Sequence, residues 1–135
     1  MLYRKKKAPS LLNGVGKEQV RATVIFSPAK TYPWLNRILK KGFAHVRVVI
    51  HQEHGINVLV DPRTAITTVH CFGGTDILIP EPGETHIRVN RMIEINKFRR
   101  AFGPLNCVEV VKGVLGIAKP LILTPHQLYK ELRNG

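Results

Sequence analysis

Apolar and polar residues alternate in short runs through the middle of the chain, which is the pattern of half-buried β-strands. Glycine, proline and small polar residues separate the runs and indicate turns. Two runs, FAHVRVVI (43–50) and INVLVD (56–61), flank the polar loop HQEHG and predict a β-hairpin. The predicted strands cover residues 23–26, 43–50, 56–61, 66–72, 76–80 and 86–89.

Other segments carry apolar residues at helical spacing. The clearest start lies near the C-terminus, where Thr124 is a good N-cap residue and Pro125 suits the first helical position. The predicted helices cover residues 32–41, 91–101 (with a weaker pattern), a segment that begins at Cys107, and 124–133. Strands in hairpins together with helices predict an α+β fold, an antiparallel sheet with helices packed on it.

The hairpin predicts a pair of polar side chains. Placing Ile50 opposite Ile56 makes one face wholly aliphatic, and a one-residue slip would destroy that face. The aliphatic pairs of this register are Val48 with Val58 and Val46 with Val60. On the other face His45 lies opposite Asp61, with Cβ atoms about 4.5–5.5 Å apart. A carboxylate beside an imidazole fixes its tautomer and stabilises the imidazolium.

The segment NCVEVVKGVLGI predicts a helix with a cysteine at its first position. Asn106 is a good N-cap residue, and Glu109 three positions later completes the pattern of a capping box. Cys107 shares an apolar stripe with Val110, Val111 and Val114 that is expected to face the sheet, while Glu109, Lys112, Gly113 and Gly116 form the other side. The helix dipole is expected to lower the pKa of the Cys107 thiol, and the backbone N–H groups there could hold an oxyanion.

Two interpretations of these residues stay open. A cysteine on an apolar helix stripe and a histidine in a strand are each more often structural than functional. Their occurrence together with an acid opposite the histidine favours a catalytic site, with Cys107 as nucleophile, His45 as general base and Asp61 as the group that orients the base.

Other arrangements of histidine and cysteine are weaker. Cys71 follows His70 directly, but neighbours in a strand point to opposite faces, so these two cannot form a dyad. A zinc site made from His45, His70, Cys71 and Cys107 would match none of the usual short ligand spacings. The sequence therefore implies no metal and no cofactor.

The net charge of the chain indicates which kinds of partner the protein would bind. The 135 residues have a formal net charge of +12, which favours anionic partners such as nucleic acid, membrane surfaces or wall polymers. Part of the excess lies at residues 4–7, so residues 1–21 are expected to form a basic, loosely ordered N-terminal arm, followed by a single domain over 22–135. Such an arm can equally serve solubility or tethering.

The same composition bears on location. No run approaches the about 18 apolar residues of a membrane span, and the basic start is not followed by the apolar segment of a signal peptide. Two cysteines in 135 residues suit a reducing compartment better than a disulfide framework. We therefore expect a protein without a membrane span or a signal peptide.

The segments KKGFAHVRVVI…INVLVDP, NCVEVVKGVLGI and LTPHQLYKEL resemble small phage-encoded proteins with a circularly permuted papain-like fold, relatives of the NlpC-type and LRAT-type cysteine hydrolases. The resemblance covers roughly residues 22–133. In that group the histidine hairpin precedes the cysteine helix, as His45 precedes Cys107 here. By the resemblance, Cys107 matches the nucleophile, His45 the base, and Asp61 a polar orienting residue whose type varies in the group.

The resemblance implies a thiol hydrolase or acyltransferase that acts on an amide, isopeptide or ester carbonyl of a peptide or acyl substrate. For a phage-like protein it implies a cell-wall peptide or a virion protein as substrate, and a cytoplasmic or virion-associated location. No side chain is assigned to the oxyanion. The alternative is a non-catalytic basic phage protein that is structural or binds nucleic acid.

Overall fold

The structure is a computed structural model that describes residues 17–29, 37, 39–63, 66–74, 79–94 and 107–134. Most of the predicted helix 32–41, residues 1–16 of the predicted arm, residues 76–78, residues 95–101 and the N-cap residue Asn106 lie outside this part of the chain. The elements are β1 (Lys17–Ser27), β2 (His45–His51), a 3-10 turn η1 (Glu53–Gly55), β3 (Ile56–Pro62), β4 (Thr67–Gly73), β5 (Thr85–Glu94), α2 (Cys107–Leu115) and α3 (Pro125–Asn134).

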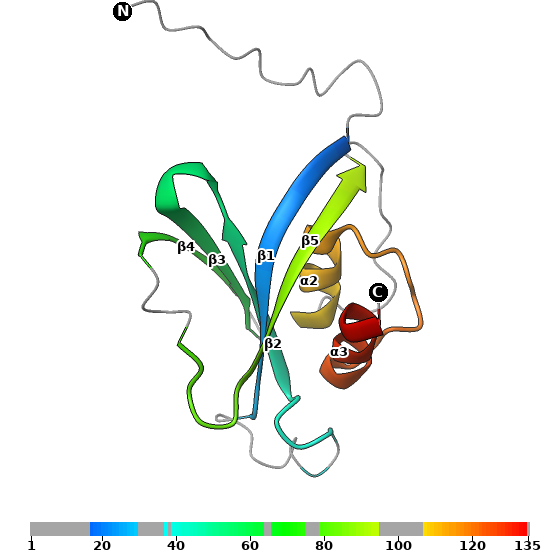
Figure 1. The fold of residues 1–135 in the computed structure, drawn as a ribbon. Helices are drawn as coiled ribbons and strands as arrows, with labels where there is room; N and C mark the ends of the chain where they lie inside the picture. Colours follow the sequence, from blue (N-terminus) through cyan, green and yellow to red (C-terminus); the bar gives the residue numbers. More distant parts are fainter. Residues whose placement is uncertain are drawn as a thin grey trace, which may run out of the picture.

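The strands form one antiparallel sheet in the order β4-β3-β2-β1-β5. Both helices lie on the same side of this sheet (Figure 1). The fold is therefore the predicted α+β arrangement of an antiparallel sheet with helices packed on it.

The β2–β3 hairpin is present, but its register differs from the prediction by two residues. Val48 pairs with Val60 rather than Val58, and His51 pairs with Asn57. The turn sets this register, because Gln52 N donates to Ile56 O at 2.8 Å and His54 takes a left-handed φ of 65°. A two-residue shift keeps every side chain on its predicted face, so the hydrophobic pattern alone cannot detect it.

Two strands are longer than predicted. β1 begins at Lys17 rather than residue 23, so residues 17–21 belong to the sheet and not to an arm. β5 continues to Glu94, so the helix predicted from residue 91 is wrong for residues 91–94. The two strands pair along ten positions, and this long-range pairing overrides a charged local sequence.

Of the remaining predicted elements, some are confirmed and one is wrong. β4 and α3 confirm the predicted strand 66–72 and the predicted helix 124–133. Thr124 caps α3 as expected, since Gln127 N donates to its Oγ1 at 3.2 Å and Thr124 N donates to the Gln127 side chain. Ile79 and Pro80 lie outside any strand, so the strand predicted at 76–80 is wrong for these two residues.

The helices cover an aliphatic face of the sheet. The buried core consists of Ala22, Val24, Phe26, Val46, Val48, Val108, Val111, Leu115, Ile117, Ile122, Leu128 and Leu132. Most of it joins the inward side chains of β1 and β2 to α2 and α3. Residues 45 and 47 flank Val46, so strand alternation points them to the opposite side.

That opposite side is called the histidine face. By the strand registers it carries His45, His51, His70 and His86 together with Arg21, Thr23, Ile25, Arg47, Val49, Asn57, Leu59, Asp61, Arg88 and Asn90. Ile25 and Val49 are fully buried in its middle. They separate a polar region around His45 from another around His51.

Helix α2 does not expose the side that its sequence suggests. Glu109 and Lys112 were expected on the outer side, yet Glu109 is buried and Lys112 is completely buried. Lys112 Nζ donates to Glu109 Oε1 at 2.6 Å and to Ile122 O at 2.9 Å. The chain after α2 folds back over this side of the helix and supplies the carbonyl group that a buried ammonium requires.

A glycine ends α2. Gly116 has a φ of 67°, and Ile117 N donates to Lys112 O at 2.9 Å in the pattern of a Schellman cap. A Cβ atom at Gly116 would lie 2.7 Å from Ile93 Cγ2. The helix can therefore end beside β5 only with glycine at this position.

Candidate active site

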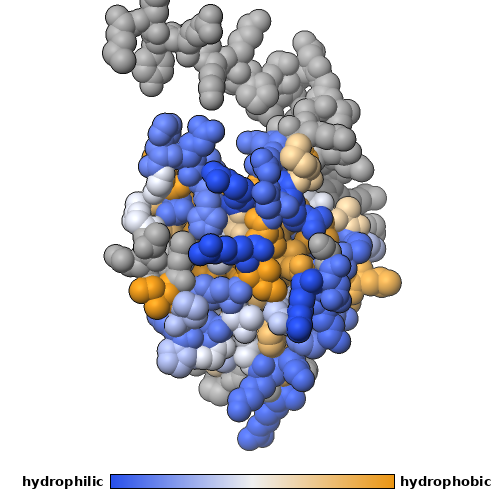
Figure 2. Space-filling view, in the orientation of Figure 1, coloured by the Kyte–Doolittle hydropathy of each residue, from blue (hydrophilic) through white to orange (hydrophobic). Residues whose placement is uncertain are grey.

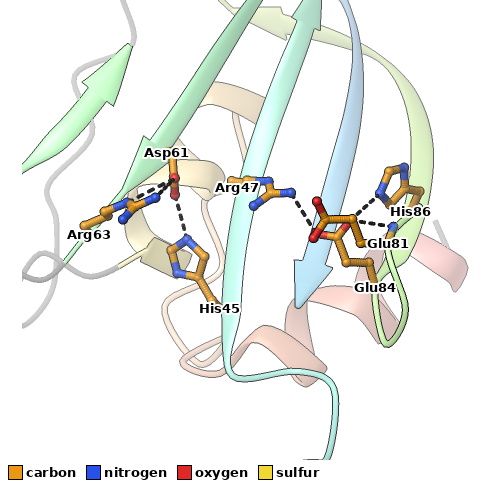
Figure 3. A network of polar contacts seen from close by, with 7 residues as sticks. All are labelled: His45, Arg47, Asp61, Arg63, Glu81, Glu84 and His86. Carbon is orange, nitrogen blue, oxygen red and sulfur yellow. Dashed lines mark hydrogen bonds and ion pairs between the residues drawn. The ribbon is translucent and has the colours of Figure 1, made fainter. Parts of the chain in front are cut away.

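His45 and Asp61 form a hydrogen-bonded pair at one end of the histidine face. His45 is the first residue of β2, and its Nε2 lies 2.7 Å from Asp61 Oδ1 on β3. The Asp61 side chain is 7% exposed and that of His45 27%. Figure 3 shows the pair, with Arg63 on the far side of the carboxylate. The two side chains meet although their backbone positions are diagonal rather than opposed.

The carboxylate stays ionised despite its burial. Burial alone would raise the pKa of Asp61, but the hydrogen bonds and charges of His45 and Arg63 outweigh it and hold the pKa below its usual range. Arg63 Nε donates to Asp61 Oδ2 at 3.2 Å. The ionised carboxylate is therefore a strong acceptor for the N–H group of the His45 ring.

Cys107 is the first residue of α2, as predicted, and its thiol lies beside β2. Its side chain packs against the core cluster, and the backbone N–H of Val46, the residue after His45, acts on its pKa. The start of the cysteine helix and the start of the histidine strand therefore lie side by side.

The expected direction of the Cys107 pKa is wrong. Burial raises the pKa of the thiol, and the negative charge of Asp61 raises it further. Backbone N–H groups of Val46, Val108 and Cys107 itself lower it, but not enough to compensate. The helix start supplies the expected donors, and the low-dielectric surroundings outweigh them. The resting group is a neutral thiol.

The structure brings two of the three predicted residues into direct contact. His45 and Asp61 are bonded, whereas among the described residues no hydrogen bond joins the Cys107 sulfur to His45. Cys107 packs on the helix side of β2, and His45 points to the histidine face. The backbone N–H of Val46, next to His45, and the charge of Asp61 both act on the pKa of the thiol.

The prediction that His70 and Cys71 point to opposite faces of their strand is confirmed. Cys71 is exposed on β4, where Val58 is its partner, and His70 pairs with Leu59 on the other face. Within the described ranges, no three histidine, cysteine or acidic side chains are grouped so that they could hold a metal ion.

A second polar network lies next to the pair and was missed from the sequence. Arg47 Nη2 donates to Glu84 Oε2 at 2.7 Å, and the Glu84 side chain also lies 3.4 Å from His86 Nε2 (Figure 3). Burial would raise the pKa of Glu84, but the backbone N–H of Glu81 and the charges of Arg47 and His86 lower it overall. Its members come from β2, β5 and the segment before β5, so only the strand order could have revealed it.

A third network surrounds His51 at the other end of the histidine face and was also missed. His51 Nε2 lies 2.7 Å from Thr23 Oγ1, and His51 Nδ1 lies 2.8 Å from Asn57 Oδ1. Asn57 Nδ2 donates to Gly74 O at 3.0 Å, which fixes the amide and makes Nδ1 of His51 the donor. The pairing of His51 with Asn57 follows from the true hairpin register, which the sequence did not supply.

The comparisons with known proteins add no family to this description: the chain matches no protein-family model, no curated protein and no solved structure. Among the described residues, no helix is both long enough and apolar enough to span a membrane.

Proposed function

We propose that this protein is a thiol hydrolase or acyltransferase in which Cys107 is the nucleophile, His45 the general base and Asp61 the residue that orients the base. The observation that carries the proposal is the 2.7 Å bond between His45 Nε2 and Asp61 Oδ1, next to Val46, whose backbone N–H acts on the pKa of the Cys107 thiol. An imidazole bonded to a buried carboxylate is the form of histidine that accepts and returns a proton.

The free nitrogen of His45 supports the assignment. Asp61 occupies Nε2, and among the described residues Nδ1 has no hydrogen-bond partner. Val46, the residue beside Cys107, is the chain neighbour of His45, but the side chains of Cys107 and His45 lie on opposite sides of β2. The proposed reaction therefore requires a rotation of the imidazole away from the histidine face. That rotation would bring Nδ1 to the thiol around the end of β2.

The chemistry follows from these roles. His45 takes the thiol proton as the Cys107 sulfur attacks the carbonyl carbon of an amide, isopeptide or ester, and backbone N–H groups at the start of α2 hold the oxyanion. The amine or alcohol leaves with the proton from His45, and an acyl-thioester remains on Cys107. Water or a second acceptor, deprotonated by His45, then releases the acyl group and restores the thiol.

Because the pKa of the Cys107 thiol is raised, the base has to act during the attack itself. A neutral buried thiol reacts only when its proton is removed during the attack, so His45 is required for each acylation. The charge of Asp61 disfavours a lone thiolate. The thiol proton therefore has to pass to a base while the sulfur attacks.

The resemblance to permuted papain-like phage proteins suggests a cell-wall peptide or a virion protein as substrate and a cytoplasmic or virion-associated site of action, and both belong to the proposal. The alternative is a non-catalytic basic protein that binds an anionic polymer, which the net charge of +12 favours. The alternative predicts an unreactive Cys107 and binding that weakens steeply with salt.

The test is labelling of the full chain with an acylating thiol probe. The Cys107→Ala variant should lose labelling, while Cys71→Ala, which removes the other cysteine, should keep it. Equal labelling of the two variants would refute Cys107 as the nucleophile. A Cys71→Ala chain that is labelled no faster than an unfolded peptide thiol would favour the binding protein instead.

A further inference from the structure

A hollow of about 430 Å³ lies on the histidine face at the end remote from His45, and the proposed reaction does not use it. Its lining residues are Arg21, His51, Arg88 and Asn90 of this face together with Ala22 and Val89, whose side chains lie on the core side of the sheet. This volume is within the range of about 300–1,000 Å³ that is usual for small-molecule sites. Figure 2 shows hydrophilic side chains gathered around the upper part of the visible face, over β1 and β3.

Two arginines stand at this hollow without partners. Within the described part of the chain the exposed side chains of Arg21 and Arg88 have no hydrogen bond and no ion pair. Arg88 pairs with Thr23, and Arg21 pairs with Asn90, so the two arginines are diagonal neighbours about 7–8 Å apart at their backbones. At this spacing both guanidinium groups can reach one group bound between them.

Their arrangement calls for an anion. The two exposed side chains carry like charges at diagonal positions of neighbouring strands, and no described carboxylate is bonded to either of them. A bound anion would remove this repulsion and would accept hydrogen bonds from two planar forks of N–H donors.

The other polar residues of the hollow are held in fixed positions. Gln19 Nε2 donates to Asn90 Oδ1 at 2.7 Å, so the NH₂ group of Asn90 remains as a donor. Thr23 and Asn57 occupy both nitrogens of His51. His51 therefore forms a rigid wall, and Arg21, Arg88 and Asn90 supply the donors.

We infer that this hollow binds the phosphate group of a phosphate-bearing ligand. A phosphate has enough oxygens to accept hydrogen bonds from both guanidinium groups and from the Asn90 amide at once. Arginine also forms bidentate hydrogen bonds with phosphate. The hollow is larger than one phosphate, so it also admits part of the attached group. A nucleotide and a nucleic-acid strand share this chemistry.

The experiment measures the binding of inorganic phosphate, uridine monophosphate and a fluorescent oligothymidylate to the full chain by titration at fixed ionic strength. Arg21→Gln and Arg88→Gln should each weaken the best of these probes about tenfold, the loss expected for a charged hydrogen-bond partner. Arg133→Gln, an exposed position on α3, removes the same charge elsewhere and should change binding by less than about twofold.

Each result has a defined meaning. Uridine monophosphate bound at least as tightly as the oligonucleotide, with loss in both site variants, identifies a free phosphate ester. Tighter oligonucleotide binding, with the same loss and a steep salt dependence, identifies a strand. Equal effects of Arg21→Gln, Arg88→Gln and Arg133→Gln, or no binding of any probe, would overturn the inference. Cys107→Ala should bind the probes as the wild-type chain does, so this test is independent of the proposed reaction.

Discussion

The histidine face has two ends, each centred on a histidine of β2, and their partners differ in kind. His45 is bonded to a carboxylate and has a nitrogen free among the described residues, whereas His51 is bonded on both nitrogens to the neutral groups of Thr23 and Asn57. A carboxylate stabilises the charged imidazole and leaves it able to exchange a proton. A hydroxyl and an amide fix the ring without adding charge. The same strand thus presents one histidine suited to proton transfer and one suited to support.

The largest expected difference between the two ends concerns catalysis. Asp61→Asn should keep the hydrogen bond but lose the charge that stabilises the imidazolium, and should lower kcat for an ester or peptide substrate by at least about a hundredfold. The matched change at the other end, Asn57→Asp, should leave kcat within about threefold. Similar losses in the two variants would remove the distinction between the ends.

A second difference, among the described residues, is that the His45 end lies beside the start of α2. Lys112→Met leaves the Glu109 carboxylate buried without its ammonium partner, and loss of one member of a buried pair costs about 3–5 kcal/mol. Urea unfolding should show this loss of stability. The double variant Glu109→Gln with Lys112→Met should recover most of it. If the single variant is as stable as the wild-type chain, α2 is not held by this pair.

Truncation of Asn57 at the His51 end should lower the stability of the fold less than Lys112→Met does, and it should not change the reactivity of the Cys107 thiol. Asn57→Leu removes the partners of His51 Nδ1 and of Gly74 O, and unsatisfied buried groups of this kind cost about 1–3 kcal/mol each. The rate of Cys107 acylation under native conditions should stay unchanged. A change in that rate equal to the one produced by Asp61→Asn would show that the two ends are coupled.

The smallest expected effect is on stability in acid. Because the folded-state pKa of Asp61 lies below its unfolded value, the His45 end contributes stability above the unfolded pKa and loses it as the pH falls through the folded pKa. The free energy of unfolding of the wild-type chain should therefore fall between about pH 5 and pH 2, and Asp61→Asn should flatten the curve. Asn57→Leu should not alter its slope, since the described partners of Asn57 are a histidine and a carbonyl group and not a carboxylate.

Much of the structure around His45 can be predicted from the local sequence. Alternation in 43–50 and 56–61 predicted the hairpin and its faces, and Asn106–Cys107 predicted where α2 begins. His45 and Asp61 were paired through a register that is wrong by two residues, and they meet because both stay on one face and long side chains reach their diagonal neighbours. The turn around His54 decides the true register, and its left-handed backbone is not evident from HQEHG.

The His51 end could not be predicted in the same way. Thr23 and Arg88 reach it through the pairing of β1 with β2 and β5, strands that lie far apart in the sequence. The charged residues at the start of β1 suggested an arm, and only the long pairing with β5 places them in the sheet. Lys112 was assigned to the surface because the loop that buries it has no periodic pattern.

The most direct measurement compares the rates at which an activated ester acylates Cys107 in a Cys71→Ser background that carries either His45→Gln or His51→Gln. If His45 is the base for a neutral thiol, His45→Gln slows acylation at least about a hundredfold near neutral pH, while His51→Gln stays within about twofold of the background chain. Equal rates in all three proteins would contradict a functional link between the thiol and His45.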